Sequence, residues 1–139
     1  MKSFLVLTFL MLTCVLHGAD QPAGNYTGHY ELTKSSKSVF SLDVQHKGKT
    51  ATMAFSASHV DGSGAAPDGD GEGQLNAKSE LVFKWTDSFS NEGMAVLRRD
   101  GKRFVLTMEP VKVEDSRAMV FYGDILLKRT LTKDPESAR

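Results

Sequence analysis

Residues 71–110, GEGQLNAKSELVFKWTDSFSNEGMAVLRRDGKRFVLTMEP, decide the fold of this chain. Apolar side chains stand at every second position in residues 81–85 and again in 104–108, and residues 94–97 form a third apolar run between them. That spacing places the apolar side chains of each run on one face of a β-strand. Asp100-Gly101 separates the last two runs, and this dipeptide supplies the positive φ angles of a tight hairpin turn. The stretch therefore predicts an antiparallel meander.

The same period of two continues on both sides of the meander. It predicts strands over residues 26–32, 40–44 and 51–57, a fourth strand that begins near Gly73, and a long last strand over 119–127. Residues 110–116 interrupt the pattern with a mostly charged segment, and no stretch shows a convincing helical period. Strands joined mostly by short turns bury their apolar faces together, without exposed edges, when the sheet closes on itself. We therefore expect an all-β fold, a single eight-stranded antiparallel up-and-down barrel over residues 20–130.

The first 19 residues have the pattern of a secretory signal peptide. Lys2 precedes an apolar run over residues 4–16, and small residues at 18–19 offer a cleavage boundary after either position. A membrane-spanning helix needs about 20 apolar residues, so the shorter run favours cleavage over anchoring. The only cysteine, Cys14, lies inside this segment, so the mature chain has no disulfide, which suits a bacterial periplasm. We expect a secreted or periplasmic protein.

Charge is balanced along the chain, which holds 17 basic and 17 acidic residues. Lys and Arg alternate with Asp and Glu and form no basic stripe, so a nucleic-acid partner is not expected. A polar tail over residues 131–139 follows the last strand. The mature chain has no thiol, and the patterns Gly-x-Ser-x-Gly and His-Glu-x-x-His do not occur. We expect no enzymatic activity and no cofactor; a histidine–carboxylate pair in a pocket would revive an enzymatic function.

One polar connection, residues 59–73, stands out because five glycines and a proline forbid a regular element there. A connection of this length is uncommon unless it is functional or disordered. Asp68, Asp70 and Glu72 alternate with glycine, as carboxylates do in calcium loops, where alternate side chains converge on one cation. The twelfth position counted from Asp68 is Ser79 instead of a glutamate, and no flanking helices are predicted. Three interpretations stay open: a solvated flexible loop, a loop that gates a cavity or docks a partner, and a calcium loop.

Aromatic side chains fall on the predicted inner faces of the strands. They are Tyr26, Tyr30, Phe55, Phe83, Trp85, Phe104 and Phe121. A barrel of eight strands can be filled by side chains or hold one small ligand, so these residues either form the core or line a pocket at the barrel mouth. Phe89 lies in a polar connection and would mark a contact site if it is exposed.

The two ends of the mature chain resemble those of the calycins, the group of small barrels that includes lipocalins and avidin-like proteins. Gly24-Asn25-Tyr26, with Gly28 and Tyr30, is similar to the glycine-aromatic opening of a first calycin strand. Leu127-Lys128-Arg129 looks like the closing strand whose arginine packs on that aromatic side chain. Tyrosine stands here where lipocalins usually have tryptophan. The resemblance implies a calycin-like barrel.

A second similarity is to bacterial periplasmic lysozyme inhibitors, which are small β proteins that insert a loop into the lysozyme cleft. Ser63-Gly64 resembles their serine-glycine loop, although Ala65-Ala66-Pro67 stands where a tyrosine usually follows. The similarity implies that the loop acts on a partner enzyme.

These observations lead to two functional hypotheses. The first is non-enzymatic binding of a small apolar ligand inside the barrel, with loop 59–73 as a lid. The alternative is a protein-interaction module, such as an inhibitor of a cell-wall hydrolase, that acts through the same loop. No residue is assigned to catalysis, a cofactor or a metal. The residues assigned to the ligand pocket or partner loop are His59, Asp61, Ser63, Asp68, Asp70, Glu72, Phe83, Trp85 and Phe89.

Overall fold

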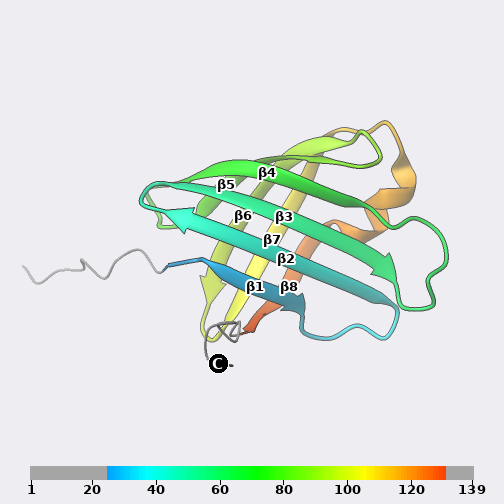
Figure 1. Cartoon of the computed structure of the whole chain (residues 1–139), viewed down its shortest axis with the longest axis horizontal. Helices are drawn as coiled ribbons and strands as arrows, with labels where there is room; N and C mark the ends of the chain where they lie inside the picture. Colours follow the sequence, from blue (N-terminus) through cyan, green and yellow to red (C-terminus); the bar gives the residue numbers. More distant parts are fainter. Residues whose placement is uncertain (1–24, 131–139) are drawn as a thin grey trace, which may run out of the picture.

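The computed structural model describes residues 25–130, which form a closed antiparallel barrel (Figure 1). Each strand pairs with the next one in the chain, and β8 pairs with β1 to close the sheet. The elements are β1 (Gly28–Leu32), β2 (Ser38–Lys47), β3 (Thr50–His59), β4 (Asp68–Leu75), β5 (Leu81–Asp87), β6 (Glu92–Asp100), β7 (Arg103–Lys112), the 3₁₀-helix η1 (Ser116–Phe121) and β8 (Gly123–Thr130). The predicted eight-stranded up-and-down barrel is confirmed.

Two predictions concern the ends of the chain, which the structure does not describe. The signal peptide over 1–19 and the tail over 131–139 lie outside the described residues. Within the described residues, no helix is long and apolar enough to cross a membrane.

The predicted hairpin between β6 and β7 is present, with its two central turn residues shifted by one position along the chain. Asp100 pairs directly with Arg103, so the turn residues are Gly101 and Lys102. Only Gly101 adopts a positive φ, +60°, and not Asp100 as well. Glycine at the first central position of a two-residue hairpin is typical of a type II′ turn.

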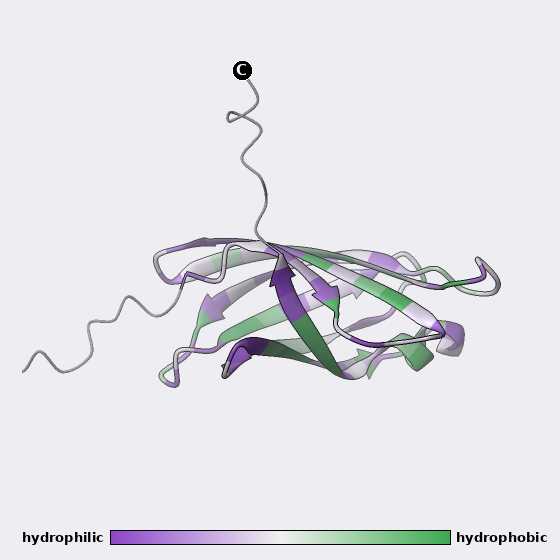
Figure 2. Ribbon diagram, turned by 90° about the horizontal axis from the view of Figure 1, so that it is seen from below, coloured by the Kyte–Doolittle hydropathy of each residue, from purple (hydrophilic) through white to green (hydrophobic). Residues whose placement is uncertain are grey.

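The barrel interior is packed with the side chains that the period-two pattern assigned to the inner faces. All the predicted inner aromatic side chains are buried in one continuous core. Figure 2 shows hydrophobic and hydrophilic residues following one another along the strands. The rings contact one another edge-on or tilted, for example Phe55 with Trp85 at a centroid distance of 6.0 Å. The core prediction is therefore confirmed.

The prediction that residues 59–73 form one long connection was wrong. The connection covers residues 60–67, and β4 begins at Asp68, so Asp68, Asp70 and Glu72 lie on a strand. Their side chains face outward, while the intervening glycines face the core. A Cβ at Gly69 would lie 2.6 Å from the Phe55 ring, and one at Gly73 would lie 2.7 Å from the Phe83 ring. The Thr86 and Val82 carbonyl oxygens of β5 would lie closer still, so glycine replaces the usual apolar residue because the backbone of the paired strand and the large aromatic side chains already occupy the space.

The prediction of a long last strand beginning at residue 119 was also wrong. β7 continues through Pro110 to Lys112, next to a register shift between Glu92 and Gly93 that accommodates the proline. Residues 116–121 then form η1, and β8 begins only at Gly123. Ala118 and Phe121 are the buried residues of η1. Residues three apart lie on one side of a 3₁₀-helix, so Ala118 and Phe121 share the buried side, whereas the predicted strand had placed Met119 and Phe121, two apart, on one face.

The connections between the strands lie in two groups, one at each end of the barrel (Figure 1). The turns at 48–49, 76–80 and 101–102 lie at one end. The connections at 33–37, 60–67, 88–91 and 113–122 lie at the other end, which we call the loop end. Binding residues concentrate on connections that a rigid scaffold positions, so the loop end is where a site is expected.

Candidate functional site

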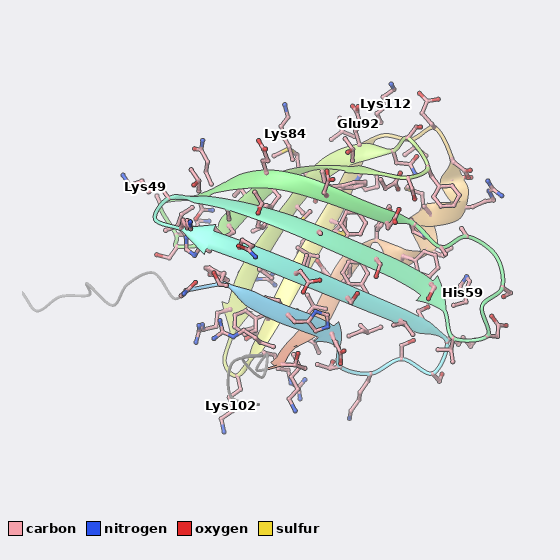
Figure 3. The ribbon with its side chains drawn as sticks, viewed as in Figure 1. Lys49, His59, Lys84, Glu92, Lys102 and Lys112 are labelled. Atoms are coloured by element: carbon pink, nitrogen blue, oxygen red, sulfur yellow. The ribbon has the colours of Figure 1, made fainter. Side chains whose placement is uncertain are left out.

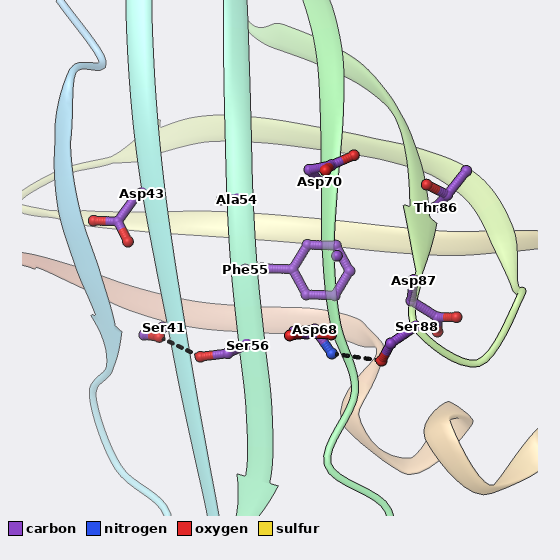
Figure 4. Close-up of a pocket in the computed structure, with 11 residues that line it drawn as sticks. Ser41, Asp43, Ala54, Phe55, Ser56, Asp68, Asp70, Thr86, Asp87 and Ser88 are labelled. Carbon is purple, nitrogen blue, oxygen red and sulfur yellow. Dashed lines mark hydrogen bonds between the residues drawn. The ribbon is translucent and has the colours of Figure 1, made fainter.

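A hollow of about 520 Å³ lies on the outer surface of the barrel near the loop end, across β2, β3, β4 and β5 (Figure 4). Most of its lining residues come from the outward-facing positions of these strands, three are inward-facing (Phe55, Gly69 and Asp87), and one, Ser88, begins the connection after β5. The lining residues are Ser41, Asp43, Ala54, Phe55, Ser56, Asp68, Gly69, Asp70, Thr86, Asp87 and Ser88. We call it the acidic hollow.

The rim of the acidic hollow is acidic and hydroxyl-rich. Asp43, Asp68 and Asp70 are exposed, and none of the lining residues, all within the described part of the chain, is basic. The hydroxyls of Ser41 and Ser56 are hydrogen-bonded to each other at 2.8 Å across β2 and β3. Carboxylates and hydroxyl oxygens are acceptors for an ammonium or guanidinium group, so the rim suits a cationic guest.

Three of the residues that line the acidic hollow face the barrel interior: Phe55, Gly69 and Asp87. Gly69 has no side chain, and the ring of the buried Phe55 lies where one would be. Asp87 is also buried, and Figure 4 shows its carboxylate pointing away from the Phe55 ring. The hollow thus combines exposed carboxylates, an aromatic ring and a buried carboxylate.

Asp87 is the centre of a buried polar network at the loop end. Its Oδ1 accepts hydrogen bonds from the backbone amides of Phe89 and Asn91, and its Oδ2 accepts from Asn91 Nδ2 at 2.9 Å and from the Tyr122 hydroxyl at 2.5 Å. Burial, together with this bond to Asp87, raises the pKa of Tyr122 far above its usual value of 10.0, so the hydroxyl stays a donor. Asn91 also accepts from the amides of Glu114 and Asp115. The network joins the connection after β5 to the segment before β8.

On the rim, Asp43 contacts a histidine from β1. Its Oδ1 lies 2.7 Å from His29 Nδ1, and Glu31 Oε1 lies 3.3 Å from His29 Nε2. The hydrogen bond with Asp43, supported by Glu31, raises the pKa of His29 above its usual 6.5. Protonated His29 therefore neutralises part of the acidic charge beside the rim. Only Asp43 of this histidine–carboxylate pair lines the hollow, and His29 is not among its lining residues.

This contact makes the stability of the protein depend on pH. Because the pKa of His29 is raised on folding, its stabilising effect is fully present below about pH 6.5 and is lost as the pH rises through the higher folded-state pKa. The ion pairs are solvent-exposed, so we expect a contribution of at most about 1 kcal/mol. Chemical denaturation of Asp43→Asn should show a larger deficit against the wild type at pH 6 than at pH 9. A His29 pKa at or below 6.5 by NMR titration would contradict this assignment.

A second hollow, of about 1650 Å³, spreads over the outer surface between β2 and β7. Lys47 and Lys84 line it together with Glu72 and Glu92, so charges of both signs are present. Figure 3 shows Lys84 and Glu92 extending from the same side of the barrel, with Lys112 nearby. Mixed charge favours no particular guest, and the acidic hollow is the more specific candidate.

The predicted site residues do not form one site. Asp68 lines the acidic hollow, Asp70 lines both hollows, and Glu72 lines the second hollow. Phe83 and Trp85 lie in the core, with exposed fractions of 0% and 1%.

The remaining predicted residues lie around the loop end. Asp61 accepts hydrogen bonds from the amide and hydroxyl of Ser63, at 3.0 and 2.6 Å, and this local turn lowers the pKa of Asp61. The His59 ring lies 4.8 Å from that of Phe121. Phe89 is half-buried, and the Arg117 guanidinium lies over it, 5.4 Å from the centroid of the Phe89 ring. Phe89 is therefore not the exposed aromatic side chain that would mark a contact site.

A calcium loop is not formed by the alternating carboxylates. Outward side chains at alternate positions of an extended strand stand about 7 Å apart and do not converge on one ion. Among residues 25–130, no group of three His, Asp or Glu side chains is arranged to hold a metal.

Sequence reasoning missed Asp43, Asp87, Asn91 and Tyr122. Asp43 has the ordinary pattern of a polar outer-face residue, and nothing in the sequence tells which outer faces lie beside β4. Asp87 and Asn91 stand in a Ser- and Asn-containing turn, where polar side chains are common. In the sequence, Asp87 stands four residues before Asn91, a spacing that is compatible with a local turn. This spacing does not reveal the contacts of Asn91 with the distant segment before β8.

The rim of the site offers carboxylate and hydroxyl acceptors, and Phe55 and the buried carboxylate of Asp87 are also among the lining residues. Comparisons of the chain with protein-family models, with curated proteins and with solved structures found no match.

Proposed function

We propose that the protein is a secreted or periplasmic, non-enzymatic interaction module that binds a basic partner protein through the acidic hollow and the adjoining connection 60–67. The observation that carries this proposal is a hollow rimmed by Asp43, Asp68 and Asp70 with no basic lining residue among those the structure describes. A lysine or arginine side chain of a partner fits such a rim by charge and by hydrogen bonding. A cell-wall hydrolase with a basic surface is the partner class that we propose.

The packing of the interior favours surface binding over an interior ligand. Several interior side chains have an exposed fraction of 0%, so no water-sized space adjoins them. They include Tyr30, Leu42, Leu81, Phe83, Leu97, Leu106 and Leu127. Binding of a small apolar ligand inside the barrel stays a prediction.

The connection 60–67 is held in place by contacts with the barrel and within the loop, as a docking loop requires. Ala65 and Pro67 are buried, and Pro67 accepts a hydrogen bond from the Ala57 amide at 2.8 Å. The Asp61–Ser63 turn holds the tip. Preorganisation lowers the entropic cost of binding, so this loop suits recognition of a partner.

We also propose that the barrel is calycin-like, as its chain ends suggest. Arg129 Nη1 donates a hydrogen bond to the Asn25 carbonyl at 2.6 Å, and a Cβ at Gly28 would lie 2.9 Å from Arg129 Cδ. The guanidinium lies 5.0 Å from the ring centroid of Phe104, which contacts Tyr26 and Tyr30 edge-on. The arginine thus stacks on Phe104 rather than on the opening tyrosine. These contacts support an arginine that bridges the two ends of the chain.

The binding proposal is tested with a cationic lysozyme as the probe. We expect Asp68→Asn/Asp70→Asn to weaken binding in isothermal titration calorimetry by at least about tenfold, or ~1.4 kcal/mol, because the double variant removes two acceptors of charge-assisted hydrogen bonds. The wild-type affinity should also fall with added salt.

The matched control is Asp100→Asn/Glu109→Gln, which removes the same charge from the β6–β7 hairpin, outside the hollow. Equal losses of affinity in the two double variants would show that only the net charge of the protein matters, and would contradict the proposed site. Absence of binding to a panel of cell-wall hydrolases would contradict the partner class. A co-purifying apolar ligand in native mass spectrometry would instead support the interior-ligand prediction.

A further inference from the structure

Asp87 is a buried carboxylate, 9% exposed, whose hydrogen bonds come from two different sources. Three come from its own turn: the amides of Phe89 and Asn91 and the side chain of Asn91. The fourth comes from the hydroxyl of Tyr122, which is 35 residues away in the chain. The turn therefore supplies three hydrogen-bond donors to this carboxylate whether or not Tyr122 is in place. The fourth donor, the Tyr122 hydroxyl, comes from a distant part of the chain.

The ring of Tyr122 occupies a slot with aromatic walls. Its centroid lies 4.9 Å from that of Trp85 and 6.0 Å from that of Phe55. The Trp85 indole N–H already donates to the Met94 carbonyl at 3.0 Å, so it needs no partner in the slot. The slot consequently presents two aromatic rings and one carboxylate oxygen, and it is filled by a phenol.

The segment that carries Tyr122 is fastened mainly by polar contacts. Ala118 and Phe121 are its buried apolar residues, and Asn91 holds its first part through hydrogen bonds with Glu114 and Asp115. A short 3₁₀-helix has weaker hydrogen-bond geometry than an α-helix. Gly123, directly after Tyr122, has a φ of +108°, a backbone freedom that other residues rarely have. Tyr122 thus sits at the end of a short 3₁₀ segment that is held mainly at Asn91, Ala118 and Phe121, and it is followed by a glycine in a conformation that other residues rarely adopt.

The slot also has access from outside. Tyr122 is itself only half-buried. Phe55 and Asp87, both contacted by Tyr122, are also among the residues that line the acidic hollow. The hollow and the slot therefore share two residues, so a small molecule in the hollow lies next to the slot.

We propose that Tyr122 is a displaceable plug, and that its slot is a binding site for a small aromatic molecule that carries a hydrogen-bond donor, such as a phenol. The guest contacts Trp85 and Phe55 at the tilted and edge-on angles of the Tyr122 ring and donates to Asp87 in place of the Tyr122 hydroxyl. No bond is made or broken covalently; one hydrogen bond is exchanged for another. The inference does not depend on the proposed partner protein.

The experiment uses p-cresol, which copies the tyrosine side chain, with toluene as the matched probe that lacks the hydroxyl. Trp85 is the only tryptophan in the chain, so its fluorescence reports on the slot directly. We expect saturable binding of p-cresol to the wild type, at least about tenfold tighter than that of toluene, because only p-cresol can donate to the carboxylate. Tyr122→Ala should bind p-cresol more tightly than the wild type, since the competing plug is removed.

Hydrogen exchange distinguishes displacement from adsorption on the surface and does not require a folded variant. Saturating p-cresol should speed amide exchange of residues 116–123 in the wild type severalfold, while exchange in β5 and β6 stays unchanged. Three results would overturn the proposal: no saturable fluorescence change in the wild type, equal affinity of the wild type for toluene and p-cresol, or unaltered exchange of residues 116–123 with p-cresol bound. None of these results bears on the Asp68 and Asp70 variants, so the two proposals fail separately.

Discussion

Gly71→Ala is expected to destabilise the barrel by at least about 3 kcal/mol, at or beyond the upper end of ordinary overpacking. A Cβ at this position would lie 2.4 Å from the backbone carbonyl oxygen of Lys84 and 3.3 Å from the methyl carbon of Met53. The Met53 side chain can move, but the Lys84 carbonyl belongs to the paired strand β5. The added methyl group therefore has to push β4 away from β5. Urea denaturation of the variant and the wild type measures the loss.

The control for this prediction is Glu72→Ala, on the same strand. Glu72 is exposed on the outer face, so removing its side chain should change the free energy of unfolding by less than about 0.5 kcal/mol. Similar stabilities for Gly71→Ala and the wild type would show that β4 and β5 can separate without cost. That result would remove the explanation given above for the acidic-glycine alternation.

Asn91→Ala is expected to cost about 3–5 kcal/mol, because Asn91 is fully buried and its side chain serves two segments at once. Its Oδ1 accepts from the amides of Glu114 and Asp115, and its Nδ2 donates to Asp87 Oδ2 and to the Asp115 carbonyl. Truncation leaves these backbone groups without a partner, and each buried unsatisfied group costs about 1–3 kcal/mol. The lower part of the range applies if the segment before β8 opens and its amides reach water.

Asn76→Ala is the matched control. Asn76 also accepts two amide hydrogen bonds, from Lys78 and Glu80, but within its own turn and closer to solvent. We expect a cost of about 1 kcal/mol there. Thermal and urea unfolding of both variants give the comparison, and equal losses would contradict the view that Asn91 fastens the loop end.

The acidic-glycine stretch shows why a correct pattern led to a wrong element. Asp68 to Gly73 alternates with a period of two, as a strand does, but glycine holds the inner positions and is normally a sign of a turn. The deciding fact is the close approach of the neighbouring strands: the Thr86 and Val82 carbonyls of β5, together with the rings of Phe55 and Phe83, leave no room for a side chain at Gly69 and Gly73. That information is tertiary, because it depends on which strands become neighbours and in what register.

The sequence by itself determined the fold class, the order of the strands and the core, because alternation in a strand is a local property that closure of the sheet only has to satisfy. It also determined the Gly101 turn, since the backbone there needs a positive φ. Only the tertiary structure decided the rest: the outward direction of Asp68 and Asp70, their meeting with Asp43 around one hollow, and the contact of Tyr122 with Asp87. Those groups come from separate strands and connections, and residues distant in the chain become neighbours only through the pairing register and the path of the segment before β8.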